Sequence, residues 1–325
     1  MKKILLLHTG GTIGCVLDDG VRALGSDESK SALFNGLSCE IEEIPFYNRT
    51  LSENMSMEKL NAIISAISKI GECDGLVVLH GTDTLAYTAS LLSTVFCATR
   101  FPIMLVSGDR PPNDEKSNAK ANLKAALELI QGGIAPNVYV PYRNSDGKMY
   151  LHLGSFIMQS PNFSSDFISA CKRSIEIDEN LHSICDGYSQ RRKNDNLNVT
   201  LKEDAVLLIH SYVGQNYGRI DLSNVSAVLC DTYHSGTVCV DGEGKHSILS
   251  LKRECDARGI LLFVAPCDVS GEIYSSTDTL LKNGIIPLNM TLESAYTKLI
   301  CGVSRGMTGE KLAAFMKTSV NNEII

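Results

Sequence analysis

Two segments of this chain place a threonine hydroxyl directly after a run of buried residues, and the first run begins at Ile4. Residues 4–7 are all apolar, and the sequence Thr-Gly-Gly-Thr follows at positions 9–12. Glycines let the backbone turn sharply at the carboxyl end of a parallel strand, which is where open α/β sheets bind ligands. Thr12 is therefore a candidate nucleophile, and a tight turn without chemistry is the alternative.

The second segment ends in a hydroxyl and a carboxylate. A buried strand predicted over residues 74–80 is followed by Gly81, Thr82 and Asp83, and a helix is predicted from Leu85 onward. Taken alone, Asp83 has the alternative role of an ordinary helix cap. Because parallel strands end at the same edge of a sheet, we expect Thr12 and Thr82 to face a common crevice.

Neither segment matches a phosphate-binding or metal-binding pattern. The glycines at positions 10, 11 and 14 lack the spacing of a dinucleotide fingerprint, and no Gly-Lys-Ser/Thr follows them. His8, His80 and His210 adjoin strands without ligand spacing, so each is expected to be a hydrogen-bonding group rather than a metal ligand. We therefore expect no metal site.

The composition argues against several classes of protein. The chain has 325 residues, 44% of them hydrophobic, and a formal charge of −7, which suits two domains and gives no basic surface for nucleic acid. Its 11 cysteines include no Cys-x-x-Cys pair, which favours free thiols in a reducing compartment. No apolar run reaches the roughly 18 residues that span a bilayer. We expect a soluble cytoplasmic protein with no nucleic-acid or membrane partner.

Strands and helices alternate along both halves of the chain. The patterns predict strands over residues 4–7, 74–80, 102–107, 137–142, 205–209, 227–230 and 260–264, and helices over 57–70, from 85, 115–131, 293–303 and 309–318. Such alternation indicates crossover units and parallel sheets. A loop predicted over residues 17–26 follows Thr12 and is well placed to act as a lid. The polar stretch 190–200 predicts a linker, which gives domains over 1–189 and 204–325 joined by residues 190–203.

Two motifs, Thr9-Gly10-Gly11-Thr12-Ile13-Gly14 and His80-Gly81-Thr82-Asp83-Thr84, together resemble those of the cytoplasmic (type I) bacterial L-asparaginases of the asparaginase/glutaminase family. The similarity continues through residues 85–90, 117–123, 265–271 and 291–299, and covers nearly the whole chain. It implies an α/β fold of two doubly wound parallel-sheet domains, the larger N-terminal one flavodoxin-like and the smaller C-terminal one Rossmann-like. It also implies a homodimeric or homotetrameric amidohydrolase that converts L-asparagine to L-aspartate and ammonia without a cofactor.

The resemblance assigns a role to each motif residue. It implies that Thr12 attacks the side-chain amide, that Thr82 belongs to a second catalytic cluster, and that Asp83 holds the α-ammonium group. Ser52 falls where the family binds the α-carboxylate, and Glu53 falls where a Gln or Glu helps to hold the ammonium. Residues 15–26 correspond to the family's mobile lid.

Three positions depart from the family pattern. Val21 stands where the lid usually carries a tyrosine, and Asn118 stands where the family has Asp. Counting five residues from Gly147 to the family's lysine arrives at His152, and the nearby lysine is Lys148. We therefore predict that His152 replaces the lysine as base, so that His152→Ala lowers hydrolysis at least about 10²-fold at nearly unchanged thermal stability. The alternatives are a re-registered Lys148, or an ordinary histidine beside a weak site.

Three other functions remain open. The first is hydrolysis of another small amide or amino-acid conjugate, and the second is amino-acid binding or sensing without catalysis. The third, the related tRNA-dependent amidotransferase subunit, is disfavoured because the first motif starts at residue 9 and because the charge is acidic. Type I enzymes also bind asparagine at a regulatory site between subunits, where Cys267 falls; packing is the alternative role for this cysteine.

Overall fold

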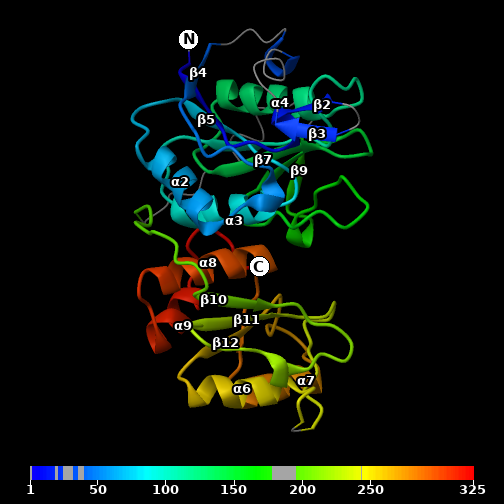
Figure 1. Cartoon of the computed structure of the whole chain (residues 1–325), viewed down its shortest axis with the longest axis vertical. Helices are drawn as coiled ribbons and strands as arrows, with labels where there is room; N and C mark the ends of the chain where they lie inside the picture. Colours follow the sequence, from blue (N-terminus) through cyan, green and yellow to red (C-terminus); the bar gives the residue numbers. More distant parts are fainter. Residues whose placement is uncertain (1, 19–20, 25–31, 36–39, 178–194, 243) are drawn as a thin grey trace. The chain divides into compact units, whose positions relative to one another are not determined.

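The computed structural model describes residues 2–18, 21–24, 32–35, 40–177, 195–242 and 244–325, with only the backbone path for 16–24. It divides into two compact units, residues 1–198 and 199–325 (Figure 1). The division falls inside the segment 190–203 for which the sequence predicts a linker. The domain boundaries 1–189 and 204–325 themselves remain a prediction.

The first unit is built on a seven-stranded sheet in the order β4-β1-β5-β6-β7-β8-β9. Five neighbouring strands are parallel: β4 (Ile41–Ile44), β1 (Ile4–His8), β5 (Gly75–Leu79), β6 (Ile103–Val106) and β7 (Val138–Arg143). Two further strands, β8 (Met149–Leu153) and β9 (Ser174–Glu176), extend the sheet antiparallel. The parallel part has the doubly wound order 2-1-3-4-5, which confirms the flavodoxin-like prediction.

Three helices cover the two faces of this sheet. In Figure 1, α4 (Ala119–Gly132) lies on one face, and α2 (Met57–Ser68) and α3 (Leu85–Val95) lie on the other. Ser56 caps α2 by accepting a hydrogen bond from the Lys59 amide, and Gly133 ends α4 in the left-handed conformation at φ 85°. The helix predicted from residue 115 begins later, because Pro111 and Asp114 hold the preceding residues in turns.

The segment after Thr12 is partly regular, so the prediction of a loop from residue 17 is wrong for the residues described. Cys15–Asp18 (β2) and Val21–Leu24 (β3) pair as an antiparallel hairpin, in which Asp18 is opposite Val21. Hydrogen bonds between the two backbones form this hairpin, and they require no alternation of apolar and polar residues that the sequence could have shown. The Val21 side chain and residues 25–26 lie outside what the structure describes.

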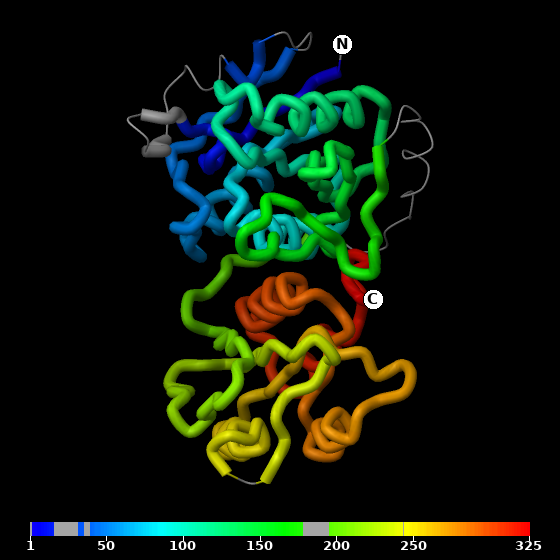
Figure 2. Tube along the Cα trace, turned by 90° about the vertical axis from the view of Figure 1, so that its right-hand side faces the viewer, coloured from blue at the N-terminus to red at the C-terminus, as the bar shows by residue number. Residues whose placement is uncertain are grey.

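The second unit holds a four-stranded parallel sheet, as predicted, with its strands in sequential order. Its strands are β10 (Val206–Ile209), β11 (Ala227–Asp231), β12 (Leu261–Ala265) and β13 (Ile286–Pro287). Its helices are α6 (Ile248–Ala257), α7 (Ser275–Lys282), α8 (Leu292–Ser304) and α9 (Gly309–Lys317). Figure 2 shows α6 and α8 on opposite faces of these strands. The sequence analysis missed α6, α7 and β13, whose hydrophobic stripes are short.

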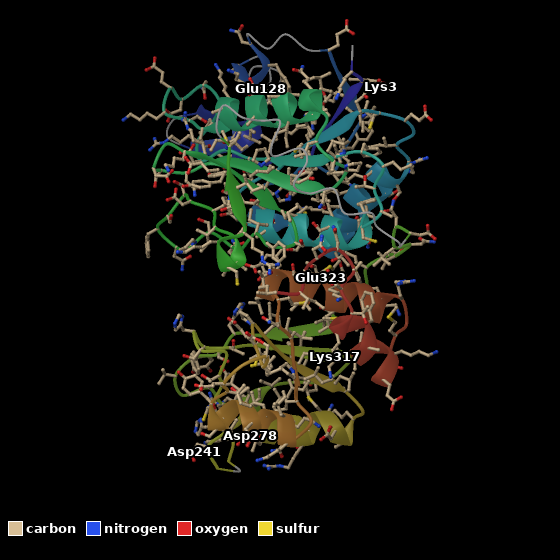
Figure 3. All side chains as sticks on the ribbon, turned by 180° about the vertical axis from the view of Figure 1, so that it is seen from behind. Lys3, Glu128, Asp241, Asp278, Lys317 and Glu323 are labelled. Atoms are coloured by element: carbon tan, nitrogen blue, oxygen red, sulfur yellow. The ribbon has the colours of Figure 1, made fainter. Side chains whose placement is uncertain are left out.

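A buried ion pair anchors the C-terminal segment of this unit. Lys298 on α8 lies 2.6 Å from a carboxylate oxygen of Glu323, and both residues are buried (Figure 3 labels Glu323). The ammonium group also donates to the carbonyl oxygens of Met316 and Thr318, and Glu323 accepts the backbone N–H groups of residues 320 and 321. These bonds compensate both buried charges. Among the described residues, no helix is long and apolar enough to cross a membrane.

Candidate active site

The turn after β1 is shaped by two glycines. Gly10 and Gly11 have φ of 115° and 81°, conformations that side chains with a Cβ rarely adopt. The Gly11 amide donates to the Thr50 carbonyl at 3.0 Å, and the Thr50 amide donates to the Thr9 carbonyl at 2.9 Å. A short 3₁₀ turn then begins at Thr12, which is partly exposed. The diglycine therefore holds Thr12 at the carboxyl edge of the sheet, as predicted.

The turn after β1 lies directly against the turn after β5. A Cβ on Gly11 would lie 2.1 Å from the Gly81 nitrogen, and a Cβ on Gly81 would lie 2.4 Å from the Ser52 Oγ atom. These distances are shorter than any real Cβ contact, so only glycine fits at either position. The contact brings together the segments that carry Thr12, Thr82 and Ser52.

Ser52 and Asp83 are joined by two hydrogen bonds. The Ser52 hydroxyl donates to an Asp83 carboxylate oxygen at 3.0 Å and accepts from the Asp83 amide at 3.1 Å. The Thr84 hydroxyl adds a bond to the Ser52 carbonyl at 3.0 Å. Ser52 is buried, whereas Asp83 and Glu53 are exposed. A fixed carboxylate beside a buried hydroxyl can hold an ammonium group.

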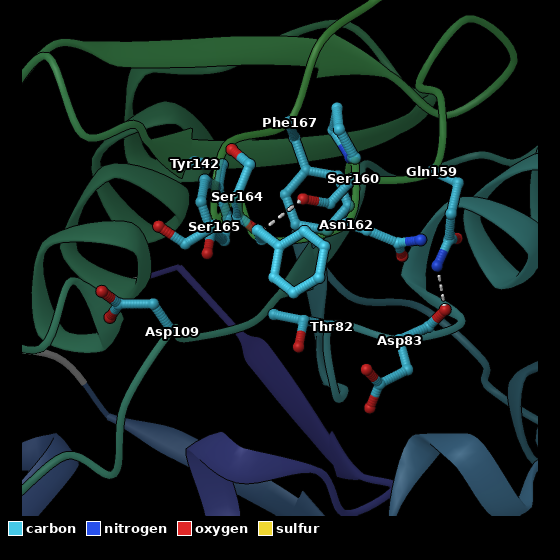
Figure 4. A pocket seen from close by; sticks show the side chains of 12 residues that line it. Thr82, Asp83, Asp109, Tyr142, Gln159, Ser160, Asn162, Ser164, Ser165 and Phe167 are labelled. Carbon is cyan, nitrogen blue, oxygen red and sulfur yellow. Dashed lines mark hydrogen bonds between the residues drawn. The ribbon is translucent and has the colours of Figure 1, made fainter.

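A pocket of about 300 Å³ opens at this edge. Its described lining is Thr82, Asp83, Asp109, Tyr142, Gln159, Ser160, Pro161, Asn162, Phe163, Ser164, Ser165 and Phe167. In Figure 4, Thr82 lies between Asp109 and Asp83, and the Gln159 side-chain amide donates to the Asp83 carbonyl. Thr12, Ser52 and Glu53 are not among the described residues that line this pocket.

Of these lining residues, sequence reasoning identified only Thr82 and Asp83, and those it missed include Asp109, Tyr142 and Gln159. Asp109 follows β6, Tyr142 lies near the end of β7, and Gln159 is in the segment after β8. The rule that identified the ends of β1 and β5 applies equally to β6 and β7, so it could have indicated Asp109 and Tyr142. Among the lining residues that the structure describes, two are carboxylates and none is Lys, Arg or His.

A family model described as "Asparaginase, N-terminal" matches residues 3–160, the part that carries these motifs. The predicted resemblance to the asparaginase family is therefore confirmed for residues 3–160. The fold agrees, since the thermostable L-asparaginase of Thermococcus kodakarensis has a TM-score of 0.79 at 23% identity, covering 99% of each chain. L-asparaginase I of Vibrio cholerae has a TM-score of 0.77 at 23% identity, covering 100% of this chain and 99% of that one.

Curated relatives with similar sequences carry a different description. The glutamyl-tRNA(Gln) amidotransferase of Methanosphaera stadtmanae has a subunit that is 27% identical over 99% of this chain and 77% of its own length. The subunit with the same description from Pyrobaculum aerophilum is 28% identical over 92% of this chain and 74% of its own length. The amidotransferase alternative, which the sequence disfavoured, therefore stays open beside the asparaginase one.

The structure does not bring either candidate substitute for the family's lysine to the pocket. His152 lies on β8, fully buried, with its Nδ1 atom 2.8 Å from the Ser169 hydroxyl, and burial lowers its pKa to about 4. Lys148 pairs with Glu176 at 2.9 Å on the exposed side of the same hairpin. The antiparallel pairing of β8 with β7 and β9 fixes both positions, and the prediction of a catalytic His152 is withdrawn.

His80 is a hydrogen-bonding group, as predicted. Its Nδ1 atom lies 2.7 Å from the Gly81 carbonyl and its Nε2 atom 2.9 Å from the Thr88 hydroxyl. The carbonyl can only accept, so Nδ1 carries the proton and Nε2 accepts from Thr88. Burial lowers the pKa of His80 to about 4, which keeps the ring neutral. His80 thus positions the turn that presents Thr82.

Two further residues singled out in the sequence have structural roles. Asn118 exchanges two hydrogen bonds with Asp109, one in each direction between side chain and backbone, at 2.9 and 3.0 Å. Cys267 is buried at the end of β12 in the core of the second unit, which favours packing for this thiol. Burial raises the Cys267 pKa, so the thiol is un-ionised. Among the described residues, no group of three or more His, Cys, Asp or Glu could hold a metal ion.

Proposed function

We propose that this chain hydrolyses the side-chain amide of L-asparagine to L-aspartate and ammonia, with Thr12 as the nucleophile. The observation that carries the proposal is the contact between Gly11 and Gly81, which joins the segments of Thr12 and Thr82. An amide is a poor electrophile, so a second polar cluster next to the nucleophile is what the reaction requires.

The substrate's charged ends would be held at the Ser52 and Asp83 pair. Asp83 offers a carboxylate to the α-ammonium group, and the Ser52 hydroxyl would turn its one proton from Asp83 to the α-carboxylate. Glu53, exposed on the same short 3₁₀ turn, would assist with the ammonium. Before the substrate arrives, Ser52 donates one hydrogen bond to the Asp83 carboxylate and accepts one from the Asp83 backbone N–H. These bonds hold Asp83 in one orientation, which reduces the entropy lost on binding.

Catalysis would proceed in two steps through an ester. The Thr12 hydroxyl attacks the amide carbon, ammonia departs, and water then cleaves the threonyl ester to give L-aspartate. Thr82 would lie beside the reacting group, and no step needs a metal or organic cofactor. We further propose a cytoplasmic homodimer or homotetramer without nucleic-acid or membrane partners, and light scattering of the purified protein tests the oligomeric state.

A second candidate function is ammonia supply in a glutamyl-tRNA(Gln) amidotransferase. The names of the curated relatives favour it. The same threonine chemistry would then act on glutamine, and the ammonia would pass to a tRNA-bound substrate on a partner protein. The formal charge of −7 does not favour direct contact with tRNA.

One set of assays separates these functions. Ammonia release is measured from L-asparagine, L-glutamine and their D-isomers, beside calorimetric binding of L-aspartate. The proposal expects L-asparagine to be preferred, and Thr12→Val to lower the rate at least about 10³-fold while Thr279→Val on α7 leaves it unchanged. Preference for glutamine favours the amidotransferase function, and ammonia from another amide favours an altered substrate. L-aspartate binding without ammonia release from any amide indicates a sensor and overturns the proposal.

A further inference from the structure

Tyr142 carries a buried hydroxyl that makes no hydrogen bond within the described part of the chain. The residue is fully buried near the end of β7, and its oxygen is closed from water. Its ring packs edge-to-face on Phe167, with centroids 4.8 Å apart. Leaving a buried hydroxyl unsatisfied is destabilising, so such a group calls for an explanation such as a ligand.

The polar neighbours of this hydroxyl already have other partners. The Asn118 side chain is close enough to interact electrostatically, but its nitrogen donates to the Arg143 carbonyl at 2.8 Å and its oxygen accepts the Asp109 amide at 2.9 Å. The contact between Asn118 and the Tyr142 hydroxyl does not reach ordinary hydrogen-bond geometry. The hydroxyl is left available for a group that arrives in the pocket.

The position of Tyr142 in the pocket indicates which part of a substrate it meets. Asp83 lies on one side of Thr82, and Asp109 lies on the other (Figure 4). Tyr142 lies on the same side of Thr82 as Asp109 (Figure 4). With the amino-acid end of the substrate held at Asp83, the amide end extends past Thr82 toward Tyr142.

We propose that the Tyr142 hydroxyl is the catalytic group that protonates the departing amide nitrogen. The inference rests on the proposed function and names a further residue of the same site. As the C–N bond breaks, the phenol proton moves to nitrogen, which leaves as ammonia. The proton that Thr12 loses on forming its C–O bond returns to the phenolate through solvent. Acylation thereby moves one proton from Thr12 to ammonia and leaves Tyr142 unchanged.

Tyr142 suits this step better than the other described lining groups. Carboxylates such as those of Asp83 and Asp109 accept hydrogen bonds at neutral pH, and the hydroxyls of Ser160, Ser164 and Ser165 are weaker acids than a phenol. Burial raises the pKa of Tyr142 to about 12, so the phenol keeps its proton at neutral pH. It gives up the proton only to the amide nitrogen, which becomes basic as the C–N bond breaks.

Because the hydroxyl is closed from water, a substrate reaches it only if part of the pocket wall moves. Residues 161–165 of this wall are exposed, and Phe163 is fully exposed with a positive φ of 64°. An exposed loop that buries little apolar surface can shift outward at low cost. The apolar Phe163 ring is then available to cover the substrate.

The test compares two leaving groups in matched variants of the full chain. Tyr142→Phe removes the hydroxyl alone, and Tyr150→Phe removes the exposed phenol paired with it across β7 and β8. The substrates are L-asparagine and L-aspartic acid β-hydroxamate, whose leaving group hydroxylamine is less basic than ammonia and depends less on protonation. Values of kcat and KM are measured for both substrates, and thermal unfolding is measured for each variant.

The inference expects Tyr142→Phe to lower kcat for L-asparagine about 10²- to 10⁴-fold, and kcat for the hydroxamate less than about 10-fold. KM stays within about threefold, the melting temperature does not fall, and Tyr150→Phe resembles wild type. Equal losses of kcat on the two substrates, or no loss, overturn the inference while the proposed function stands. Absence of turnover by the wild type on any amide overturns both.

Discussion

Gly11 and Gly81, 70 positions apart in the sequence, touch so closely that a methyl group on Gly11 would lie 2.1 Å from the backbone nitrogen of Gly81. This contact joins the turns after β1 and β5. Two glycines are needed because neither backbone leaves room for a side chain. The candidate site depends on this contact, since it sets the separation of the segments bearing Thr12 and Thr82.

The first prediction concerns this contact. Gly11→Ala should lower amide hydrolysis at least about 10²-fold, because the Cβ forces the two turns apart and misplaces the nucleophile. Gly147→Ala is the matched control, since Gly147 has a similar φ of 83° with no atom within 4 Å of its Cβ. The control should lose only about 1 kcal/mol of stability. Equal rates in the two variants would show that the contact does not position Thr12.

The second prediction concerns how Asp83 is held. Ser52→Ala removes a donor and an acceptor from Asp83, so KM for L-asparagine should rise about 10-fold or more while kcat changes less than about threefold. Ser56→Ala is the control, because Ser56 only caps α2. It should cost about 1 kcal/mol of stability at unchanged KM. A normal KM in Ser52→Ala would remove this serine from substrate binding.

The third prediction concerns acid stability. Burial lowers the pKa values of His80 and His152 from 6.5 to about 4, so below pH 6.5 the unfolded chain binds protons that the folded chain does not. Stability should therefore fall as the pH is lowered from 6.5 to 4, by up to about 3 kcal/mol for each histidine. Urea unfolding across this range measures the slope.

His152→Gln should make that slope shallower, because it removes one of the two buried histidines. The same His152 variant should keep its hydrolytic rate within about threefold, because the structure does not place His152 at the pocket. A wild-type slope in His152→Gln contradicts the pKa argument. A large loss of rate would restore the catalytic role.

The fourth prediction concerns the second unit. Glu323→Gln should destabilise it by about 3–5 kcal/mol, because Lys298 is left as an uncompensated buried charge. Asp278→Asn, which breaks the exposed pair with Lys282, should cost less than about 1 kcal/mol. Urea unfolding followed by circular dichroism measures both. A small effect of Glu323→Gln would mean that water or another group compensates Lys298.

The sequence by itself determined the α/β class, the parallel strands and the turns that present Thr12 and Thr82, because hydrophobic runs and glycines act locally. It missed β8 and β9, and counting residues from Gly147 led to a wrong role for His152. Only the tertiary structure decided that Asp109 and Tyr142 share a pocket with Thr82 and that His152 is buried. Sheet order and antiparallel register set these relationships, and both depend on contacts between segments far apart in the chain.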